Sequence, residues 1–480
     1  MARQTVPIAV AYGDGIGPEI MTAVLYILQE GGADIDLHEV GIGEKVYLEG
    51  ELAGIHPSAW EIIRKCKAFL KAPITTPQGG GYKSLNVTVR TTLGLYANVR
   101  PCVSYYPFVA TKFPGMDVVI VRENEEDLYM GIEYQLTHET IEALKVMTRP
   151  GCERIIRYAF EYAQAYQRKK VTCFTKDNIL KFSDGLFHKV FDEIAAEYPG
   201  IQNEHWIVDI GAAKLADSPT EFDVVVLPNL YGDILSDVAA QIAGSVGLAG
   251  SANIGTAGAM FEAIHGSAPR RAGQNVANPS GLLLAAIQML VHIGQPEAAM
   301  RIHNAWLKTL EEGIHTYDIH KEATSKKKAG TKEFAQAVAS RLGMVPEVLP
   351  AVHYEKARHI HHSVKQTLEK AGAMKKELVG VDLFIQWDPK DNSLADKLNG
   401  ISIPNLRLKF INNRGVKVWP ERIPETLCSD CWRCRFAKES EEKPLSYQQV
   451  IALLEAVSGK KIEIAQVQSL YMMDGRLAHT

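Results

Sequence analysis

The sequence predicts an α/β protein with a separate α+β domain at its C-terminal end, and three observations support this prediction. First, short apolar runs alternate with helical stretches through residue 342. Second, the composition shifts to proline, histidine and charged residues over residues 344–376, as in a connector. Third, the residues beyond it follow the order strand, helix, two strands, helix, strand, which is the split βαβ order of a ferredoxin-like domain.

The elements are placed by their apolar patterns. In the first part we expect strands at residues 7–12, 68–70, 118–121, 171–174 and 224–227, and helices at 18–30 and 154–168. In the last part we expect strands at residues 378–387, 406–411, 431–436 and 462–467, and helices at 393–398 and 447–457. Residues 281–294 form the longest apolar helix candidate, but Gln288 and His292 interrupt it. A buried helix is therefore expected there, not a membrane span.

The first apolar run ends in a glycine-rich turn. Residues 13–17 read Gly-Asp-Gly-Ile-Gly, and Pro18 stands where a Rossmann fingerprint requires its third glycine. Proline suits the first turn of a helix, and the glycines suit the bend before it. A strand-to-helix turn therefore explains this segment without an ordinary dinucleotide site.

Polar groups suited to an anion follow a triple glycine at residues 79–81. The glycines let the backbone approach a ligand closely. Ser84, Asn86 and Arg90 then supply a hydroxyl, an amide and a planar guanidinium. Arg100 lies in the next patterned segment, directly before Pro101. These residue types predict a site for carboxylates.

Arg122 stands at the end of the apolar run 118–121. A guanidinium at the end of a buried strand requires an anionic partner. For Arg122 alone, a ligand and the acidic residues at 123 and 125–127 are equally good partners. Together with Arg90 and Arg100, the ligand is favoured.

Three acidic residues complete the pattern: Asp209, Asp233 and Asp237. The strand at 224–227 ends at Pro228, the chain turns through Gly232, and a helix is expected to begin near Asp233. Asp233 and Asp237 are then four residues apart on one helical face, within reach of one cation. Oxygen ligands of this kind suit Mg²⁺ or Mn²⁺. Taken alone, the pair is better explained by helix capping at Asp233 and solvation of Asp237, but together with the arginines the metal site is favoured.

Composition excludes several other classes of function. The chain has 480 residues, 46% of them hydrophobic, and a formal net charge of −4, so it has no general attraction to nucleic acid or to an anionic membrane. No signal-peptide core is present at the N-terminus, and a cytoplasmic location is expected.

Cysteine and histidine clusters give weaker signals. Cys428, Cys431 and Cys434 are spaced three apart, but a zinc site requires a fourth ligand, and the alternation of Trp432, Cys434 and Phe436 fits a strand face. The histidines at 359, 361 and 362 fit a polar linker better than a metal site.

In this order, the motifs resemble those of the β-decarboxylating dehydrogenases and, within them, of the NADP-dependent isocitrate dehydrogenases of the bacterial branch with a C-terminal extension. The resemblance runs from Gly13 to about Leu342. The motifs that carry it are Ser84-x-Asn86-x-x-x-Arg90, the segment ending Asn98-Val99-Arg100, Arg122-Glu-Asn-x-Glu-Asp-x-Tyr129, Lys176-x-Asn178, Gly232-Asp233-x-x-Ser236-Asp237 and His265-Gly-Ser-Ala-Pro269.

The resemblance implies roles for these residues. Ser84, Asn86, Arg90, Arg100 and Arg122 would bind the carboxylates of isocitrate, and Asp209, Asp233 and Asp237 would hold Mg²⁺ or Mn²⁺. Tyr129 and Lys176 would transfer protons, with their high pKa values lowered by the local field. In the family Lys176 and Asp209 reach into the neighbouring subunit's site, so a homodimer with shared active sites, or a higher assembly, is expected.

The family places its cofactor on the loop from Glu262 to Asn278. Arg270 and Arg271 stand where NADP-using relatives carry lysine and tyrosine, and two guanidiniums would pair with a 2′-phosphate. NADP is therefore the expected cofactor. The expected contacts are Thr75, Asn178, Glu262, His265, Gly266, Ala268, Arg270, Arg271, Asn278, Tyr317 and Lys321. Lys214 departs from the family, which usually has glutamine there, and its role stays open.

The implied activity is oxidative decarboxylation of isocitrate to 2-oxoglutarate and CO₂ with reduction of NADP, a step of the citric acid cycle. Homoisocitrate and 3-isopropylmalate dehydrogenases are alternatives within the family, but Ser84 and Asn86 offer hydrogen bonds to a third carboxylate. A regulatory protein with a relict core is the alternative outside it. Phosphorylation of Ser84 would repel substrate, and whether it occurs is open.

The implied fold has a cleft between two domains. Residues 1–95 and 244–343 would form a large discontinuous domain that binds the cofactor, and residues 96–243 a small inserted domain. Residues 344–376 would link these to a ferredoxin-like domain at residues 377–480, for which assembly is favoured over ligand sensing.

Overall fold

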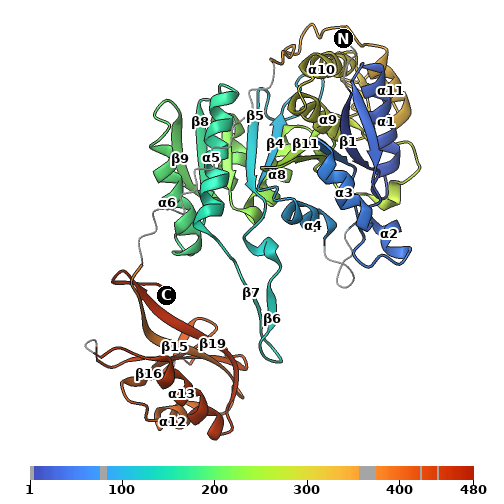
Figure 1. Ribbon diagram of the computed structural model, residues 1–480. Helices are drawn as coiled ribbons and strands as arrows, with labels where there is room; N and C mark the ends of the chain where they lie inside the picture. The colour runs from blue at the N-terminus through green and yellow to red at the C-terminus, as the bar shows by residue number, and fades with distance from the viewer. Residues whose placement is uncertain (1–4, 76–83, 356–373, 422–423, 441–442) are drawn as a thin grey trace. The chain divides into compact units, whose positions relative to one another are not determined.

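The computed structural model describes residues 5–75, 84–355, 374–421, 424–440 and 443–480 (Figure 1). The chain divides into two compact units. The first comprises Met1–Met130 and Lys145–Val364, and the second comprises Gly131–Leu144 and Lys365–Thr480. The triple glycine at 79–81 and the histidines at 359–362 lie outside the described residues.

A ten-stranded sheet forms the centre of the first unit, in the order β2-β1-β3-β12-β11-β4-β5-β10-β8-β9. Its strands are β1 (Val6–Ala11), β2 (Ile35–Glu39), β3 (Ala68–Lys71), β4 (Ala97–Val103), β5 (Asp117–Glu123), β8 (Lys170–Thr175), β9 (Gln202–Ile207), β10 (Val224–Leu227), β11 (Gly250–Ile254) and β12 (Ala259–Ala263). Strand β11 is antiparallel to both β12 and β4, and β4 is antiparallel to β5. The other neighbouring pairs are parallel.

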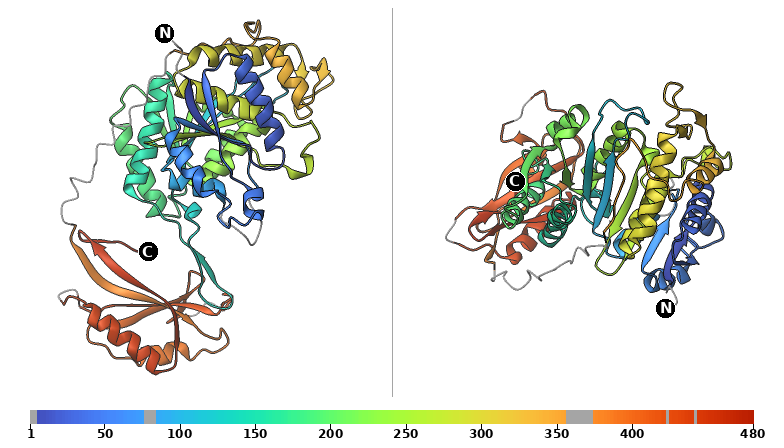
Figure 2. Two further views of the ribbon diagram at one scale, coloured as in Figure 1. Left: turned by 45° about the vertical axis from the view of Figure 1, so that its right-hand side comes forward. Right: turned by 90° about the horizontal axis from the view of Figure 1, so that it is seen from above.

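Helices cover both faces of this sheet (Figure 2). On one face, α1 (Gly17–Glu30), α5 (Arg149–Ala165), α6 (Ser183–Ala195) and α9 (Ser280–His292) share the largest core with the strands, and α10 (Pro296–Glu311) and α11 (Thr331–Ala339) pack on α9 and α1. On the other face lie α3 (Pro57–Lys65), α4 (Leu85–Thr92), α7 (Val208–Asp217) and α8 (Asn229–Ala243). A sheet covered on both faces requires apolar strands, which explains the runs at 118–121 and 224–227.

Smaller elements complete the first unit. They are α2 (Glu44–Leu48), the short strands β13 (Ile314–His315) and β14 (Lys327–Lys328), and the 3₁₀ turns η1 (Leu128–Met130), η2 (Pro219–Glu221), η3 (Val246–Leu248) and η4 (Pro269–Arg271). The buried helix predicted at 281–294 is confirmed as α9, whose residues from Ser280 to Ala286 are all buried. Among the described residues, no helix has the length and apolar character to cross a bilayer.

One helix boundary differs from the prediction. Helix α8 begins at Asn229, one turn before the expected start near Asp233. Pro228 precedes it with a φ of −53°, which suits the residue before a helix, and the strand ends at Leu227. Asp233 and Asp237 therefore both lie inside the helix, so the capping explanation for Asp233 is wrong.

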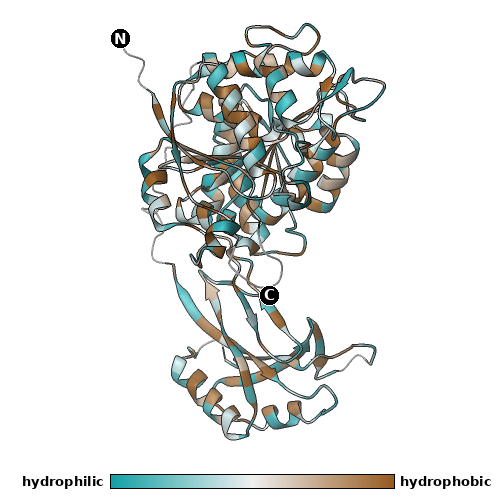
Figure 3. Ribbon diagram, turned by 90° about the vertical axis from the view of Figure 1, so that its right-hand side faces the viewer, coloured by the Kyte–Doolittle hydropathy of each residue, from teal (hydrophilic) through white to brown (hydrophobic). Residues whose placement is uncertain are grey.

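The second unit contains a six-stranded antiparallel sheet in the order β17-β16-β18-β15-β19-β20. Its elements are β15 (Lys376–Gln386), α12 (Leu394–Asn399), β16 (Leu406–Asn413), β17 (Val416–Trp419), β18 (Cys431–Lys438), α13 (Tyr447–Gly459), β19 (Glu463–Met473) and β20 (Arg476–Leu477). The four long strands and two helices follow the predicted ferredoxin-like order, while β17 and β20 are additional edge strands. Trp432, Cys434 and Phe436 lie in the core, as their alternation predicts. In Figure 3 the helices carry apolar and polar residues in alternation, as amphipathic helices do.

A hairpin from the middle of the chain belongs to this second unit. It contains β6 (Glu133–Gln135) and β7 (Ile141–Ala143). The buried carboxylate of Asp430 accepts hydrogen bonds from the Thr137 hydroxyl at 2.5 Å and from the Glu139 amide at 3.3 Å. Residues 131–144 thus group with the C-terminal domain, whereas the predicted domains place all of 96–243 together.

Candidate active site

A row of buried polar side chains crosses four neighbouring strands of the large sheet. Lys71 in β3 lies 2.6 Å from a carboxylate oxygen of Glu262 in β12. Asn253 in β11 donates to Glu262 at 2.9 Å, and Asn98 in β4 donates to Asn253 at 2.9 Å. Arg100 continues the row, because its Nε donates to the side-chain oxygen of Asn98 at 2.6 Å. This row lies on the sheet face that α4 and α8 cover, since Arg90 in α4 and Ser236 in α8 contact its two ends.

Arg90 is held at one end of the row. Its Nη2 lies 2.8 Å from Glu262, and both side chains are buried. Burial opposes the charge of Glu262, but the charges of Lys71 and Arg90 outweigh burial and lower its pKa, so Glu262 is a carboxylate. The Nε of Arg90 is buried and has no hydrogen-bond partner among the described residues. A buried donor of this kind is suited to an anionic ligand.

Arg100 and Arg122 point toward the acidic face of α8. Arg122 pairs with Asp233, and its Nη2 donates to the Asn229 side-chain oxygen at 2.7 Å. Arg100 lies 3.5 Å from Asp233 and 3.4 Å from Asp237. Burial and the nearby charges of Arg100 and Arg90 lower the pKa of Arg122 to about 9. The partner of Arg122 is therefore on α8, and the neighbouring acidic residues at 123–127 do not pair with it in the described structure.

Tyr129 joins the same cluster from the 3₁₀ turn η1. Its hydroxyl donates to Asp233 at 2.6 Å, and the guanidinium of Arg122 lies 4.7 Å from its ring centre. Burial, together with the hydrogen bond to the Asp233 carboxylate, raises the pKa of Tyr129 although Arg122 acts against the shift. The rise has two causes, since the phenol is half-buried and already donates to an anion. A pKa lowered by a bound metal ion together with the arginines stays a prediction of the family resemblance.

Asp233 and Asp237 fit a divalent cation. Burial opposes ionisation of Asp233, but Arg122 and Arg100 outweigh it and lower its pKa. Burial and the charge of Asp233 instead raise the pKa of Asp237. The side chain of Asp237 is 56% exposed, so it can reach a ligand. The two carboxylates lie one helical turn apart, and the charge of Asp233 disfavours ionisation of Asp237. A cation bound to both would reduce this repulsion.

Asp209 and Lys176 form a separate pair in the same chain. Asp209 lies in the first turn of α7, and Lys176 follows β8. The Lys176 Nζ is 2.5 Å from Asp209, and this contact lowers the pKa of Asp209. Within the described residues neither side chain contacts Asp233 or Asp237. The structure thus places the predicted site residues in two clusters.

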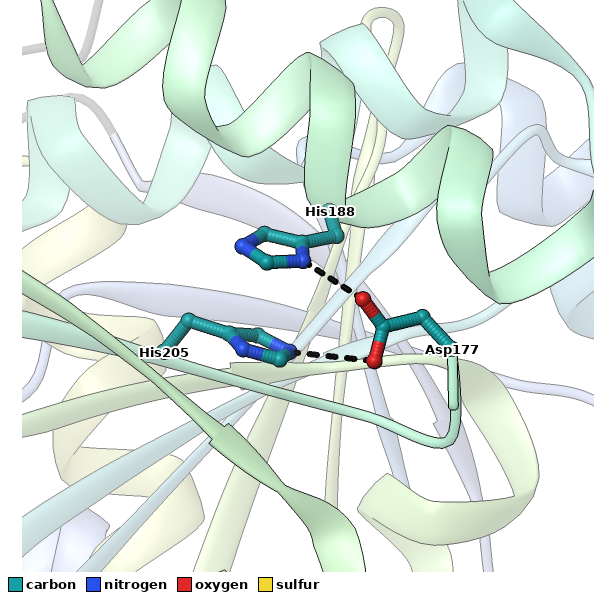
Figure 4. A group of neighbouring side chains, drawn as sticks. All are labelled: Asp177, His188 and His205. Atoms are coloured by element: carbon teal, nitrogen blue, oxygen red, sulfur yellow. Dashed lines mark hydrogen bonds and ion pairs between the residues drawn. The ribbon is translucent and has the colours of Figure 1, made fainter. Parts of the chain in front are cut away.

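A cluster of two histidines and a carboxylate supports the Lys176 loop (Figure 4). His188 Nδ1 lies 2.7 Å from Asp177, and His205 Nε2 lies 4.0 Å from the other oxygen of that carboxylate. Their donor atoms lie within 4.8 Å of one another, as a metal site requires. The rings, however, stack with centres 3.5 Å apart and planes at 15°. Lone pairs in parallel ring planes do not converge on one ion, so His188 holds the loop through its hydrogen bond to Asp177, and His205 hydrogen-bonds Thr175 at 2.8 Å. This cluster could not be predicted from the sequence, because its three residues come from separate elements.

The predicted cofactor loop follows β12 and contains unsatisfied groups. His265 contacts the Gly266 carbonyl at 3.1 Å, while its Nε2 is buried without a hydrogen-bond partner among the described residues. A side chain at Gly266 would meet no atom within 4 Å, so the backbone there is open. Thr75 and Ser267 share a hydrogen bond of 2.9 Å, and Ala268 has a φ of 39°. An orphaned ring nitrogen beside open backbone fits a bound nucleotide.

The basic residues proposed for a phosphate are exposed. The guanidinium of Arg271 lies 4.6 Å from the ring centre of Tyr317, and Arg270 and Lys321 are also exposed. Lys214 lies elsewhere, 3.6 Å from Glu221 and over the ring of Trp206.

The other predicted contacts are placed as follows. Asn278 donates to Asp318 at 3.0 Å, and Asn178 is exposed in the loop after Lys176. Ser84 and Asn86 are half-buried at the start of α4, where the side-chain oxygen of Asn86 has no hydrogen-bond partner among the described residues.

Comparison with known proteins gives a consistent result over the whole chain. The family model described as isocitrate/isopropylmalate dehydrogenase matches residues 7–338, and the model described as bacterial isocitrate dehydrogenase, C-terminal domain, matches residues 376–480.

Curated relatives match nearly end to end. A protein of Rickettsia bellii named isocitrate dehydrogenase [NADP] is 55% identical over 477 residues, which cover 99% of this chain and 98% of that protein. The protein of the same name from Thermus thermophilus is 40% identical, covering 90% of this chain and 87% of the relative. A solved structure from Thermus thermophilus superimposes with a TM-score of 0.91 at 37% identity, covering 100% of this chain and 96% of that one. The structure of isocitrate dehydrogenase from Methylococcus capsulatus superimposes with a TM-score of 0.68 at 42% identity, covering 70% of this chain and 99% of that one.

Proposed function

Because the chain belongs to the isocitrate/isopropylmalate dehydrogenase family, we propose that it oxidises isocitrate to 2-oxoglutarate and CO₂ with reduction of NADP. The observation that carries this proposal is the convergence of Arg90, Arg100 and Arg122 on the polar row and on the acidic face of α8. With Lys71, the cluster holds four cationic side chains against the three carboxylates of Glu262, Asp233 and Asp237, and a bound tricarboxylate would supply further negative charge.

The arginines and the residues of α4 would orient the substrate. Arg100 and Arg122 lie at the metal end of the site, so they would bind the carboxylate beside the hydroxyl. Among the described residues the buried Nε of Arg90 has no hydrogen-bond partner, so it could donate to a second carboxylate, and the side-chain oxygen of Asn86 in α4 could accept from the substrate hydroxyl or a water molecule. The polar groups of Ser84 and Asn86 favour isocitrate over 3-isopropylmalate, because they could hydrogen-bond a third carboxylate but not an apolar group.

Asp233 and Asp237 would hold Mg²⁺ or Mn²⁺ together with Asp209 of the partner subunit, and the bound ion would supply Lewis acidity at the substrate hydroxyl and carboxylate. NADP, held by the loop after β12, would accept the hydride. The Tyr129 hydroxyl would deliver a proton to the carbon that loses CO₂. The Lys176 amine of the partner subunit would take part in removing the hydroxyl proton.

Pairing of two chains is part of the proposal, and the division of the site into two clusters supports it. Lys176 and Asp209 contact each other and lie apart from Asp233 in one chain, so a second copy would bring the clusters together. Exposed apolar side chains flank both clusters: Ile179 and Phe182 follow Lys176, Ile210 follows Asp209, and Ile234 follows Asp233. Apolar exposure beside charged site residues suits an interface with a second copy. We assign the C-terminal domain to assembly as well.

Initial rates of NADPH and NADH formation test the reaction. We expect metal-dependent NADPH formation from isocitrate and little turnover of isopropylmalate or homoisocitrate. Loss of the rate with chelator, and its return with Mg²⁺, is part of the expected result. Faster turnover with NAD, or with another substrate, would contradict the proposal.

Mixed variants test the shared site. Tyr129→Phe and Lys176→Met chains are each expected to be inactive alone. After unfolding and refolding together, the mixed dimer has one intact site, so about a quarter of the wild-type rate should return by random pairing. Each variant refolded alone serves as the control. No recovery from the mixture would show that Tyr129 and Lys176 serve the same site within one chain.

A further inference from the structure

One largely buried lysine, Lys145, lies between two fully buried carboxylates. Lys145 Nζ is 2.6 Å from Asp127 and 3.2 Å from Asp184. Both aspartate side chains are 0% exposed and the lysine is 13% exposed. The ammonium also lies 4.9 Å from the ring centre of Tyr231. Two carboxylates withdrawn from water on one cation form a unit in which neither can move without losing its counter-charge.

Asp127 holds the segment that carries Tyr129. Its second carboxylate oxygen accepts the Leu230 amide at 2.9 Å, in the first turn of α8. Its own amide donates to Val146 at 2.9 Å, next to Lys145. Asp127 has a φ of 66°, an unfavourable conformation for a residue with a side chain, so these contacts fix the backbone there. Tyr129 follows two residues later and meets Asp233 one turn along α8.

Asp184 holds the loop that carries Lys176. Its second oxygen accepts the backbone amide of Lys176 at 2.6 Å. Asp184 lies in the first turn of α6, and Lys176 is the first residue after β8. The amide bond sets where the loop leaves the sheet and therefore where the Lys176 amine can reach.

We propose that Lys145 is a positioning residue that couples the Tyr129 segment to the Lys176 loop. This inference rests on the proposed function, in which Tyr129 serves the site of its own chain and Lys176 that of the partner. The path Asp127, Lys145, Asp184 then connects the two active sites of a dimer through the interior of one subunit. Loss of order at either end is transmitted because both ends share one ammonium.

Hydrogen exchange in Asp184→Asn tests the coupling directly. Asparagine keeps the shape and can still accept the Lys176 amide, but it does not attract Lys145 as a carboxylate does. We expect amide exchange to rise by about fivefold or more both at residues 175–180 and at residues 124–130. Lys145→Arg keeps the positive charge and changes its geometry, so it should also raise amide exchange in both segments. This variant replaces Asp184→Asn in the test if the asparagine variant does not fold. A change confined to one segment, or no change in either, overturns the coupling.

Arg168→Gln is the matched control. Arg168 likewise lies between two carboxylates, 2.7 Å from Asp117 and 3.0 Å from Asp223, in the same half of the sheet. Both partners lie at the starts of strands, at the end of the sheet away from Tyr129 and Lys176. Exchange at residues 124–130 and 175–180 should stay unchanged in this variant. An equal rise there would show that loss of any such ion pair loosens the unit, which overturns a specific role for Lys145.

Steady-state rates separate positioning from folding. Asp184→Asn is expected to lower kcat by about tenfold while KM for isocitrate changes by less than about twofold, because the arginines stay in place. Arg168→Gln should leave kcat unchanged even where it lowers stability. A wild-type kcat in a variant that loosens both segments would also overturn the positioning role. The exchange experiment needs no turnover, so an inactive wild-type protein would refute the proposed function and leave the coupling to be judged by exchange.

Discussion

Replacing Glu123 by glutamine should stabilise the protein, and more so at alkaline than at acidic pH. Glu123 is the last residue of β5 and its side chain is buried. Its Oε1 accepts the amide of Glu125 at 2.7 Å, and its Oε2 accepts that of Glu126 at 3.0 Å. Burial nonetheless raises the pKa to about 7 from its ordinary value of 4.5. Glutamine has nearly the same shape, keeps an acceptor for these amides and carries no charge.

The sign follows from proton linkage. Since the folded chain holds the proton more tightly than the unfolded chain, the charge of Glu123 costs nothing well below pH 4.5, and the cost grows as the pH rises to about 7. Above that pH the full shift corresponds to about 3 kcal/mol, and near pH 5 to about 1 kcal/mol. The gain in unfolding free energy from Glu123→Gln should therefore be about 2 kcal/mol larger at pH 8 than at pH 5.

Urea unfolding of both proteins at these two pH values measures the difference, at one protein concentration because assembly contributes to stability. Glu322→Gln, at an exposed position, is the control and should show no such pH dependence. A variant no more stable than wild type at pH 8, or a gain that is equal at both pH values, would refute the reasoning.

Three further changes probe other parts of the molecule. Replacing Arg270 and Arg271 by glutamine should lower kcat/KM for NADP by about tenfold to a hundredfold with little change for NAD, measured by initial rates; an equal loss for both cofactors would contradict a 2′-phosphate contact. Asp233→Asn should lower the rate by at least about a hundredfold and weaken Mg²⁺ binding in calorimetry, while the exposed Asp217→Asn should do neither. Asp430→Ala should remove the hydrogen bonds to Thr137 and Glu139, destabilise the hairpin by about 2 kcal/mol and speed proteolysis within residues 131–144; an unchanged cleavage rate would show that other contacts hold the hairpin.

Local patterns were sufficient for much of the fold and for part of the site. The spacing of Asp233 and Asp237 placed both on α8, and the apolar run before Arg122 placed that guanidinium at the end of β5. The ferredoxin-like order of strands and helices could be predicted because apolar residues recur at different spacings in strands and in helices. These features depend on residues close together in the sequence, and the spacing of apolar residues gives information over that range.

Contacts between distant segments were not predictable in the same way. Arg90 and Glu262 are separated by 172 positions, and no local pattern indicates that these predicted substrate and cofactor residues contact each other. The grouping of residues 131–144 with the C-terminal domain includes hydrogen bonds to Asp430, which has no distinctive pattern around it. The direction of the pKa shift of Tyr129 depends on burial and on Asp233, which only the folded chain brings together.

The strand order of the large sheet also constrains how the chain can fold as it is synthesised. Strand β3 pairs on one side with β1, which precedes it closely, and on the other with β12, where Phe69 meets Met260. The intervening strands β4, β5, β10, β8 and β9 are contiguous in the sheet and complete by Leu227. That half can therefore assemble first, while β3 keeps an open edge until β12 emerges. Pairings of such long range slow folding, and an unpaired strand edge is prone to aggregation. The nascent N-terminal strands are thus the part of this chain most dependent on protection before synthesis ends.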